Sequence, residues 1–242
     1  MIKTDAEQER EEKEDIMKYV ISDIHGMWDK YQNMLKLIKF SAEDELYILG
    51  DVIDRGEDGI KILQDIRRHT NMHLLMGNHE LMAVQTLFAQ DENEWNEKMI
   101  VWAMNGGEGT YYSLLELPEE EQKELAELLI TLPDCMEVEV NGHMFHLVHG
   151  FPADTLEKQV WTRPELNTKN PFKDKTLIVG HTPVMLLHDN PDKYIHMLRE
   201  KGKHVEIEHA EGFIDIDCGC SSGIPEERLA CLRLQDMKEF YV

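Results

Sequence analysis

Cysteines and long apolar segments are scarce in this chain, and each absence excludes a class of protein. The sequence has 4 cysteines among 242 residues, without regular spacing, so we expect no disulfide framework and a reduced, cytoplasmic setting. No apolar run approaches the ~18 residues of a membrane-spanning helix. The sequence begins with a run of charged residues, whereas a signal peptide has a basic start and an apolar middle. We therefore expect neither a signal peptide nor a membrane partner.

Basic residues are also few. The chain carries 25 lysines and arginines against 48 acidic residues, which gives a formal net charge of −23. Nonspecific binding to nucleic acid or to an anionic membrane needs a basic surface, so this charge argues against both partners. A phosphorylated substrate remains compatible with it, because screening limits charge interactions to ~8 Å at physiological salt and a few local cations suffice.

Internal repeats and linkers rich in proline, glycine or serine are missing as well, so nothing divides the chain into several domains. Hydrophobic residues make up 42% of the sequence, which is enough for one core of ordinary size. We therefore expect a charged N-terminal arm over residues 1–17 and a single domain over residues 18–242. Nothing in the sequence indicates the oligomeric state.

Hydrophobic periodicity indicates an α/β fold. Segments with apolar residues at helical spacing, residues 27–40 and Gly59–His69, separate strand-like runs at Lys18–Ser22, Leu46–Leu49 and Asn71–Met76. The middle of the chain, residues 80–132, is helical in character and is expected to form a helical cap. Its predicted apolar face contains Trp95, Ile100, Val101 and Met104.

The pattern changes to strands after Pro133. Asn141-Gly142 stands between two alternating runs and predicts a tight hairpin. Further strands are expected at Thr176–Val179, Gly212–Asp217 and Leu229–Leu234.

The segment "YILGDVIDRGEDG", residues 47–59, places two aspartates and an arginine directly behind a buried strand. Charges in such a place must be paired or must bind an ion. Polar residues also follow four other predicted strands, at the edge where ligands bind in open α/β sheets. The residues are Asp23 and His25; Asp51, Asp54 and Arg55; Asn78 and His79; His149; and His181.

These side chains form a set of possible metal ligands. Carboxylates, imidazoles and an amide oxygen, with no thiolate among them, suit Mn²⁺, Fe or Zn²⁺ better than Cu(I) or an iron–sulfur cluster. Their number exceeds the need of one ion that keeps a position open for water or substrate. We therefore expect two divalent metal ions that share a bridging carboxylate, manganese being favoured and iron or zinc the alternatives. Such pairs, ~3.5–4 Å apart, hold a phosphoryl oxygen and turn a bridging water into hydroxide.

The order of five motifs resembles that of the calcineurin-like metallophosphoesterases. The motifs are "DIHG", "GDVIDRG", "GNHE", "HG" and "GHTP", and the segments "WAMNGGEGTYYSL" and "VWTRPEL" also look like parts of this family. Within it, the chain is similar to the phosphoprotein phosphatase branch, especially the small phage-lambda-type serine/threonine phosphatases. The resemblance extends from about Lys18 to Asp217. It implies a β-sandwich flanked by helices in an α/β catalytic domain.

The resemblance also implies two metal ions with one shared ligand. The first ion would take Asp23, His25 and the bridging Asp51, and the second would take Asp51, Asn78, His149 and His181.

The remaining residues would act on the substrate. His79 would be the general acid, held by Asp54, because a carboxylate beside an imidazole favours its protonated form. Arg55 and Arg163 would bind the phosphate oxygens with their planar guanidinium groups.

A serine/threonine protein phosphatase is therefore the expected function, acting on a phosphoprotein or a phosphorylated small molecule. We expect direct in-line hydrolysis by metal-bound hydroxide, because no cysteine has the flanking arginine and glycines of a thiol phosphatase. The alternative is a dinucleoside polyphosphate hydrolase, since symmetric tetraphosphatases share much of the layout. That enzyme needs a base-holding surface, for which the candidates are tryptophans that we otherwise expect in packing: Trp28, Trp95, Trp102 and Trp161. A binding module without activity is disfavoured, because ligands, acid and phosphate-binding residues are all present.

Three features depart from the family pattern. Ser22 stands where glycine is usual, and "DCGC" at Asp217–Cys220 replaces a more typical turn. Cys218 and Cys220 could respond to oxidation near a metal, but we expect them to be small residues of a turn. The stretch from Leu186 to Phe213 is longer than the family leads us to expect, and forms either a flap beside the site or a surface excursion.

Overall fold

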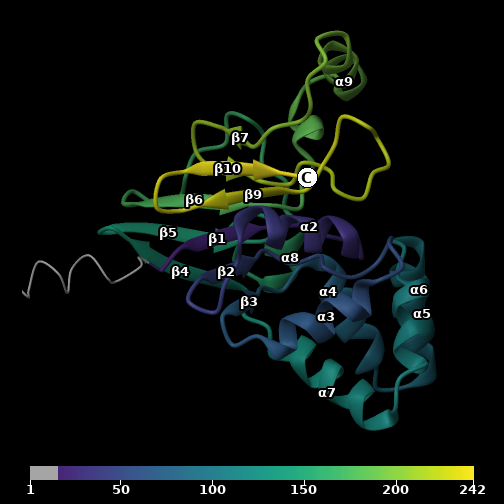
Figure 1. Ribbon diagram of the computed structural model, residues 1–242. Coiled ribbons are helices and arrows are strands. Elements are labelled where there is room, and N and C mark those ends of the chain that lie inside the picture. Colours follow the sequence, from purple (N-terminus) through teal and green to yellow (C-terminus); the bar gives the residue numbers. More distant parts are fainter. Residues whose placement is uncertain (1–15) are drawn as a thin grey trace, which may run out of the picture.

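The computed structural model describes residues 16–242, and two mixed sheets form its centre (Figure 1). The predicted arm over residues 1–17 lies outside the described residues except for Ile16 and Met17. One sheet has five strands in the order β10-β9-β1-β2-β3, and the other has five in the order β4-β5-β6-β8-β7. The predicted α/β architecture of two sheets flanked by helices is therefore confirmed.

The first sheet contains the predicted β-α-β-α-β unit. Its parallel strands are β1 (Lys18–Ile21), β2 (Glu45–Ile48) and β3 (Met72–Leu74), and the connecting helices are α2 (Trp28–Ile38) and α3 (Gly59–Arg68). Side chains alternate across β1, because Tyr19 and Ile21 pack with the helices whereas Val20 packs between the sheets. The predicted β9 (Ala230–Arg233) pairs antiparallel with β1, and β10 (Lys238–Tyr241), which was not predicted, forms the edge.

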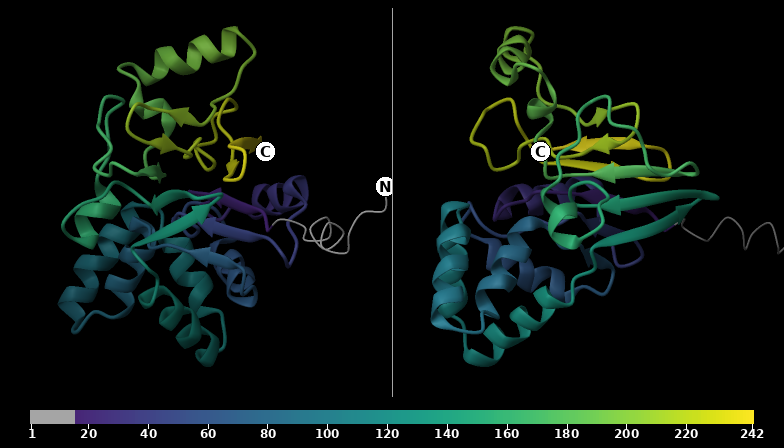
Figure 2. Two further views of the ribbon diagram at one scale, coloured as in Figure 1. Left: turned by 90° about the vertical axis from the view of Figure 1, so that its left-hand side faces the viewer. Right: turned by 180° about the vertical axis from the view of Figure 1, so that it is seen from behind.

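A group of helices covers one side of the sheets, as the three views show (Figures 1 and 2). It forms the predicted helical cap and contains α4 (Asn78–Leu87), α5 (Glu92–Met104), α6 (Glu108–Leu115) and α7 (Glu119–Ile130). Within residues 16–242, no helix combines the length and the apolar character needed to cross a membrane.

The apolar face predicted for α5 is wrong. Ile100, Val101 and Met104 are 60%, 48% and 83% exposed. The helix instead turns Trp102 into the core, where the side chain is fully buried, and Met99 packs beside it. Because residues 100, 101 and 104 share a different face of the helix, burying Trp102 leaves them in solvent.

The second sheet begins with the predicted hairpin of β4 (Cys135–Val140) and β5 (His143–Val148). Asn141 and Gly142 have φ values of 53° and 79°, the left-handed conformations that a two-residue turn of the matching twist requires. After α8 (Leu156–Trp161), strand β6 (Lys175–Val179) pairs parallel with β5. Phe145, Leu147 and Ile178 pack from this sheet against the first one.

The excursion between β6 and β8 (Ile214–Asp215) carries its own elements: η1 (Val184–Leu187), α9 (Pro191–Glu200) and β7 (Glu208–His209). Helix α9 buries Ile195 and Leu198 and lies at the opposite end of the molecule from α7 (Figures 1 and 2). The strand predicted at Gly212–Asp217 is shorter than expected. Its end is lost because the Asp217 N–H donates a hydrogen bond to Asp215 Oδ1 at 2.9 Å.

Candidate metal centre

The polar residues predicted as a site follow the ends of five strands. The loops after β1, β2, β5 and β6 each supply at least one of them, Asn78 and His79 begin α4 shortly after β3, and Arg163 lies just beyond α8. The parallel strands β1, β2 and β3 end at one edge of the first sheet, and the parallel strands β5 and β6 end at one edge of the second. The loops that follow neighbouring strands therefore lie close together. Two of these loops touch directly: the Asp23 N–H donates to Gly50 O at 3.3 Å, and the His25 N–H donates to Asp51 O at 2.9 Å.

The backbone of these loops takes an unusual conformation. Among the described residues, nine other than glycine have a positive φ, and six of them belong to the predicted site. Asp23, His25, Asp51, Asp54, Arg55 and His181 have φ values from 47° to 70°. A side chain in the left-handed region is uncommon and carries a cost, and such positions cluster at functional sites.

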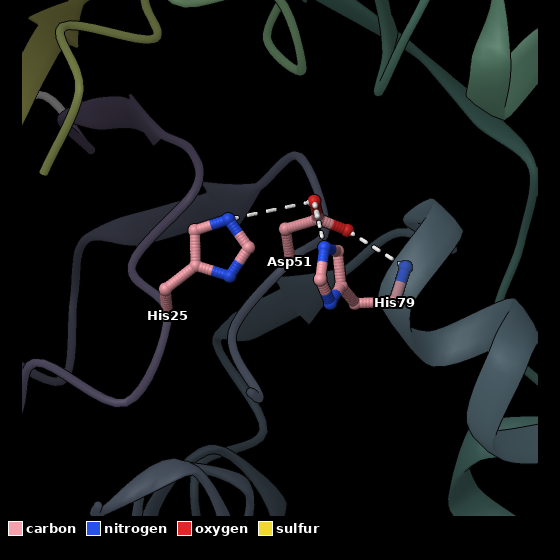
Figure 3. Close-up of side chains that lie close together, drawn as sticks. All are labelled: His25, Asp51 and His79. Carbon is pink, nitrogen blue, oxygen red and sulfur yellow. Dashed lines mark hydrogen bonds and ion pairs between the residues drawn. The ribbon is translucent and has the colours of Figure 1, made fainter. Parts of the chain in front are cut away.

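Asp51 lies at the centre of the site, between His25 and His79 (Figure 3). Its Oδ2 is 3.7 Å from His25 Nε2 and 3.8 Å from His79 Nε2, and its Oδ1 is 3.4 Å from His149 Nε2. Asp51 belongs to two groups of side chains that could each hold a metal ion. The groups are His25, Asp51 and His79, and Asp51, His149 and His181.

Backbone carbonyls orient two of the imidazole rings. His25 Nδ1 donates a hydrogen bond to Ile53 O at 3.0 Å, and His149 Nδ1 donates to Leu49 O at 2.5 Å. In both rings the other nitrogen, Nε2, therefore faces Asp51 as an available ligand atom. His181 Nε2 is buried and has no hydrogen-bond partner among residues 16–242, so this nitrogen is available to bind a metal ion.

The charges of the site also favour a bound cation. Burial raises the pKa of Asp51 well above its usual value, an effect that His79 opposes and Asp23 reinforces. Burial and the neighbouring cationic groups lower the pKa of His25 and of His181, so both imidazoles are neutral and able to bind metal. A buried carboxylate surrounded by neutral nitrogen ligands is suited to bind a divalent ion, because the ion's positive charge would balance the carboxylate's negative charge.

Not every predicted ligand takes part in these two groups. Asn78 does approach, since its Oδ1 lies 2.9 Å from His149 Nε2. Asp23 is outside both groups. Its Oδ2 accepts a hydrogen bond from the His181 N–H at 3.0 Å and another from the Ser22 hydroxyl. Ser22 therefore helps to orient the Asp23 carboxylate.

His79 forms a second functional unit with Asp54. His79 Nδ1 donates to Asp54 Oδ2 at 2.6 Å, and its Nε2 lies 3.2 Å from a guanidinium nitrogen of Arg55. Burial lowers the pKa of His79, but Asp51 and Asp54 outweigh burial and raise this pKa above its ordinary value. The imidazole therefore keeps its proton at a higher pH than a free histidine does, as a general acid must.

Trp102 supports this pair in a way that its spacing did not predict. Its indole Nε1 donates to Asp54 Oδ2 at 2.8 Å, so the same carboxylate oxygen accepts from Trp102 and from His79. The sequence predicts only that Trp102 packs in the protein interior. Helical spacing does not show that its indole N–H reaches a carboxylate far away in the sequence.

Replacing Trp102 by phenylalanine is expected to lower kcat on an unactivated phosphate ester about tenfold, because a hydrogen bond to a charged group contributes about 1.5 kcal/mol. The ring remains, so metal content should not change. Trp95→Phe is the matched control, since Trp95 lies in the same helix and packs on Tyr111. Equal kcat values for the two variants would contradict the role of the indole N–H.

Glu80 is a further residue whose role the motif alone did not reveal. The side chain is fully buried and accepts backbone N–H groups from both neighbouring loops. Asp51 and Val52 donate at 2.7 and 2.9 Å, and Gly77 donates at 3.1 Å. The carboxylate thereby ties the loop after β2 to the loop after β3 and fixes Asp51 in its strained conformation.

Replacing Glu80 by alanine is expected to lower the free energy of unfolding by about 3 kcal/mol or more, because several buried N–H groups lose their acceptor. Glu80→Gln should not rescue it, since the amide NH₂ would face other donors. Urea unfolding of the metal-free protein measures this, with the exposed Glu120→Ala as control. A Glu80→Gln protein as stable as the parent would contradict it.

Buried carboxyl and thiol groups in and after β8 also lie near the site. Burial, reinforced by neighbouring carboxylates, raises the pKa of Asp215 and of Asp217. Cys218 and Cys220 are buried in the turn that follows β8, and burial raises the pKa of both thiols, that of Cys220 to about 12. Both stay protonated, as expected for small residues of a turn and not for nucleophiles.

Comparison with known proteins agrees with this geometry. Serine/threonine-protein phosphatase 2 of Salmonella typhimurium is 31% identical over 161 residues, which is 61% of this chain and 68% of that protein. The symmetrical bis(5'-nucleosyl)-tetraphosphatase of Wigglesworthia glossinidia brevipalpis is 40% identical over 65 residues, 26% of this chain and 24% of that protein. A solved protein serine/threonine phosphatase from Saccharomyces cerevisiae shares the fold, with a TM-score of 0.58 and 14% identity over 95% of this chain and 80% of that one.

The sequence model of calcineurin-like phosphoesterases matches residues 19–207, a range that contains every residue predicted for the site. The match covers most of the chain and confirms the resemblance drawn from the motifs. This chain therefore belongs to the calcineurin-like phosphoesterases and is a phosphoric ester hydrolase.

Proposed function

We propose that this hydrolase is a serine/threonine protein phosphatase that uses two divalent metal ions, manganese being favoured over iron and zinc. The observation that carries the proposal is the position of Asp51. It belongs to both groups of possible ligands, and the His79–Asp54 pair lies against the same carboxylate. A dinuclear centre and a proton donor would thus meet at one point of the molecule.

The residues of the chain divide the work on the substrate. With both ions bound, the centre would supply positive charge to the phosphate oxygens and a water molecule of lowered pKa. Arg55 and Arg163 would bind the phosphate oxygens and balance the negative charge of the transition state. His79 would donate a proton from Nε2 to the leaving oxygen, because Asp54 holds the Nδ1 side of the ring.

Dinucleoside polyphosphate hydrolysis is the second candidate, and a cavity beside Arg55 favours it. The cavity has a volume of about 490 Å³, and Trp28 and Lys30 line it together with Arg55. An aromatic ring and cations beside a phosphate-binding arginine are what a nucleotide requires. The protein phosphatase has the stronger support, because the phosphatase of Salmonella aligns over 161 residues and the tetraphosphatase over 65.

We further propose one catalytic domain over residues 18–242 that acts in the cytoplasm. Its support is the continuous core of the two sheets and the state of the cysteines, all four of which are free. Reduced cysteines are typical of proteins in a reducing compartment.

Elemental analysis and substrate comparison test the proposal together. The purified chain, reconstituted with Mn²⁺, is assayed on a phosphothreonine peptide and on diadenosine tetraphosphate. We expect about two ions per chain, as in dinuclear phosphatases, and a higher kcat/KM on the peptide. Selective cleavage of the dinucleotide would contradict the protein phosphatase and support the dinucleoside polyphosphate hydrolase. Absence of both metal and activity would contradict the ligand assignment.

A further inference from the structure

One cavity is lined by two segments that each begin close in sequence to residues of the candidate site. Its volume is about 370 Å³, and both walls continue loops of the site. One wall starts at Glu165, two residues after Arg163 and therefore within about 7 Å of it along the chain. The other wall is η1 and the residues after it, which begin three positions beyond His181. The cavity is lined by Glu165, Leu166, Asn167, Leu186, Leu187 and His188, together with Asp189.

A second cavity of about 550 Å³ continues toward α9. It shares His188 and Asp189 with the first, and Tyr194, Met197 and Glu200 belong to its α9 wall. The ring of His188 stacks on Tyr194 with centroids 3.8 Å apart and forms part of the wall. The two cavities lie on either side of this shared wall, and we refer to them together as the α9 groove. The excursion over residues 186–213 thus extends the surface around the site.

The α9 groove exposes apolar side chains that a surface helix normally buries. Leu186 is 46% exposed and Met197 is 37% exposed, and both lie in the groove. Trp161 lines neither cavity, but it is 39% exposed and its ring lies 5.9 Å from that of His181 at the candidate site. Exposed apolar side chains in cavities near a catalytic site are a candidate binding surface.

Acidic residues line the rim of the groove. Glu165 and Asp189 form no ion pair with any residue from 16 to 242. Glu200 is partly compensated, since it lies 3.3 Å from His196. Lys193 is the one lysine among the residues that line the described groove. An unpaired acidic rim attracts basic ligands and repels the several negative charges of a dinucleoside polyphosphate.

We propose that the α9 groove binds the polypeptide of a phosphoprotein substrate whose phosphorylated residue is flanked by basic and apolar residues. The acidic rim would pair with the basic side chains, and Leu186 and Met197 would contact the apolar ones. An extended peptide fits such a groove, because its alternate side chains point to opposite sides and can occupy neighbouring cavities. This inference rests on the proposed protein phosphatase activity and names its substrate class.

Two phosphothreonine peptides of equal length test the inference, one with arginine and leucine flanks and one with glutamate and serine flanks. The full-length, Mn²⁺-loaded enzyme should have a kcat/KM about tenfold higher on the basic peptide than on the acidic one. In Glu165→Lys/Asp189→Lys this preference should disappear or reverse. Replacing leucine by serine in the basic peptide should lower kcat/KM for the parent enzyme. The same replacement should lower kcat/KM less for the Leu186→Ala/Met197→Ala variant.

A double charge reversal outside the groove is the matched control. Glu116→Lys/Glu120→Lys changes the net charge equally just after α6 and in α7, the helix at the opposite end of the molecule from α9 (Figure 1), and should keep the preference. Equal kcat/KM values of the parent enzyme on the two peptides would contradict peptide binding in the α9 groove, but not the protein phosphatase activity. An unchanged preference in Glu165→Lys/Asp189→Lys would overturn it too. If the parent cleaves p-nitrophenyl phosphate but neither peptide, both the groove and the proposed function fall.

Discussion

Replacing Asp51 by asparagine is expected to release metal from both groups of ligands and to lower kcat/KM about 1,000-fold or more. Asp51 is the residue that the two groups share. The amide keeps the shape of the side chain but lacks the negative charge that attracts cations to this buried position. A loss of charge stabilisation of about 4 kcal/mol in the transition state corresponds to the expected factor. Elemental analysis and kinetics on p-nitrophenyl phosphate measure the two effects.

Asp91→Asn is a suitable control for this substitution. Asp91 caps α5 by accepting the N–H groups of Asn93 and Glu94, and asparagine caps a helix about as well as aspartate. This variant should keep both ions and full activity. If Asp51→Asn did the same, the assignment of a shared ligand would be wrong. Loss of one ion alone would place Asp51 in a single group.

Replacing His79 by asparagine is expected to slow the hydrolysis of a phosphothreonine peptide by about 100- to 10,000-fold. The threonine alkoxide is a poor leaving group and needs the proton that His79 Nε2 would supply. The nitrophenolate leaves without a proton, so p-nitrophenyl phosphate should be slowed far less. The measurement is kcat on both substrates together with metal content.

Metal content decides between two roles for His79, because the ring also belongs to a possible ligand group with His25 and Asp51. A general acid leaves both ions in place when it is replaced, whereas a ligand does not. His146→Asn is the control: His146 is also buried and bonds a carboxylate, with Nδ1 2.7 Å from Glu137 Oε1, but lies outside the site. Equal slowing of both substrates in His79→Asn would argue against proton donation.

The residues of the candidate site other than Arg163 could be predicted because each follows closely after a strand. A strand ends at a recognisable residue, and parallel neighbours end at one edge, so Asp23, Asp51 and Asn78 had to be close in space. The hairpin at Asn141-Gly142 followed in the same way from a local rule about left-handed turns. The roles of the two arginines came only from resemblance, and they remain proposals.

Features that depend on distant contacts could not be predicted. Trp102 is 48 positions from Asp54, and a helical period does not show that its N–H reaches that carboxylate. The same contact explains why the face predicted for α5 was wrong, since Trp102 determines which side of the helix is buried. Glu80 stands in the "GNHE" motif, yet its bonds to Asp51 and Val52 cross 29 and 28 positions.

The five-residue segment Asp51–Arg55 contains the proposed shared ligand, the partner of the proposed acid and an arginine proposed to bind phosphate. A single insertion or deletion there would move all three together, and a displacement of about 1 Å can cost about 100-fold in rate. The excursion between β6 and β8 carries none of these groups and extends to the surface at α9. If the α9 groove binds the substrate as proposed, sequence change in this excursion would alter which substrates are accepted, while the proposed chemistry would depend on a segment that tolerates almost no change in length.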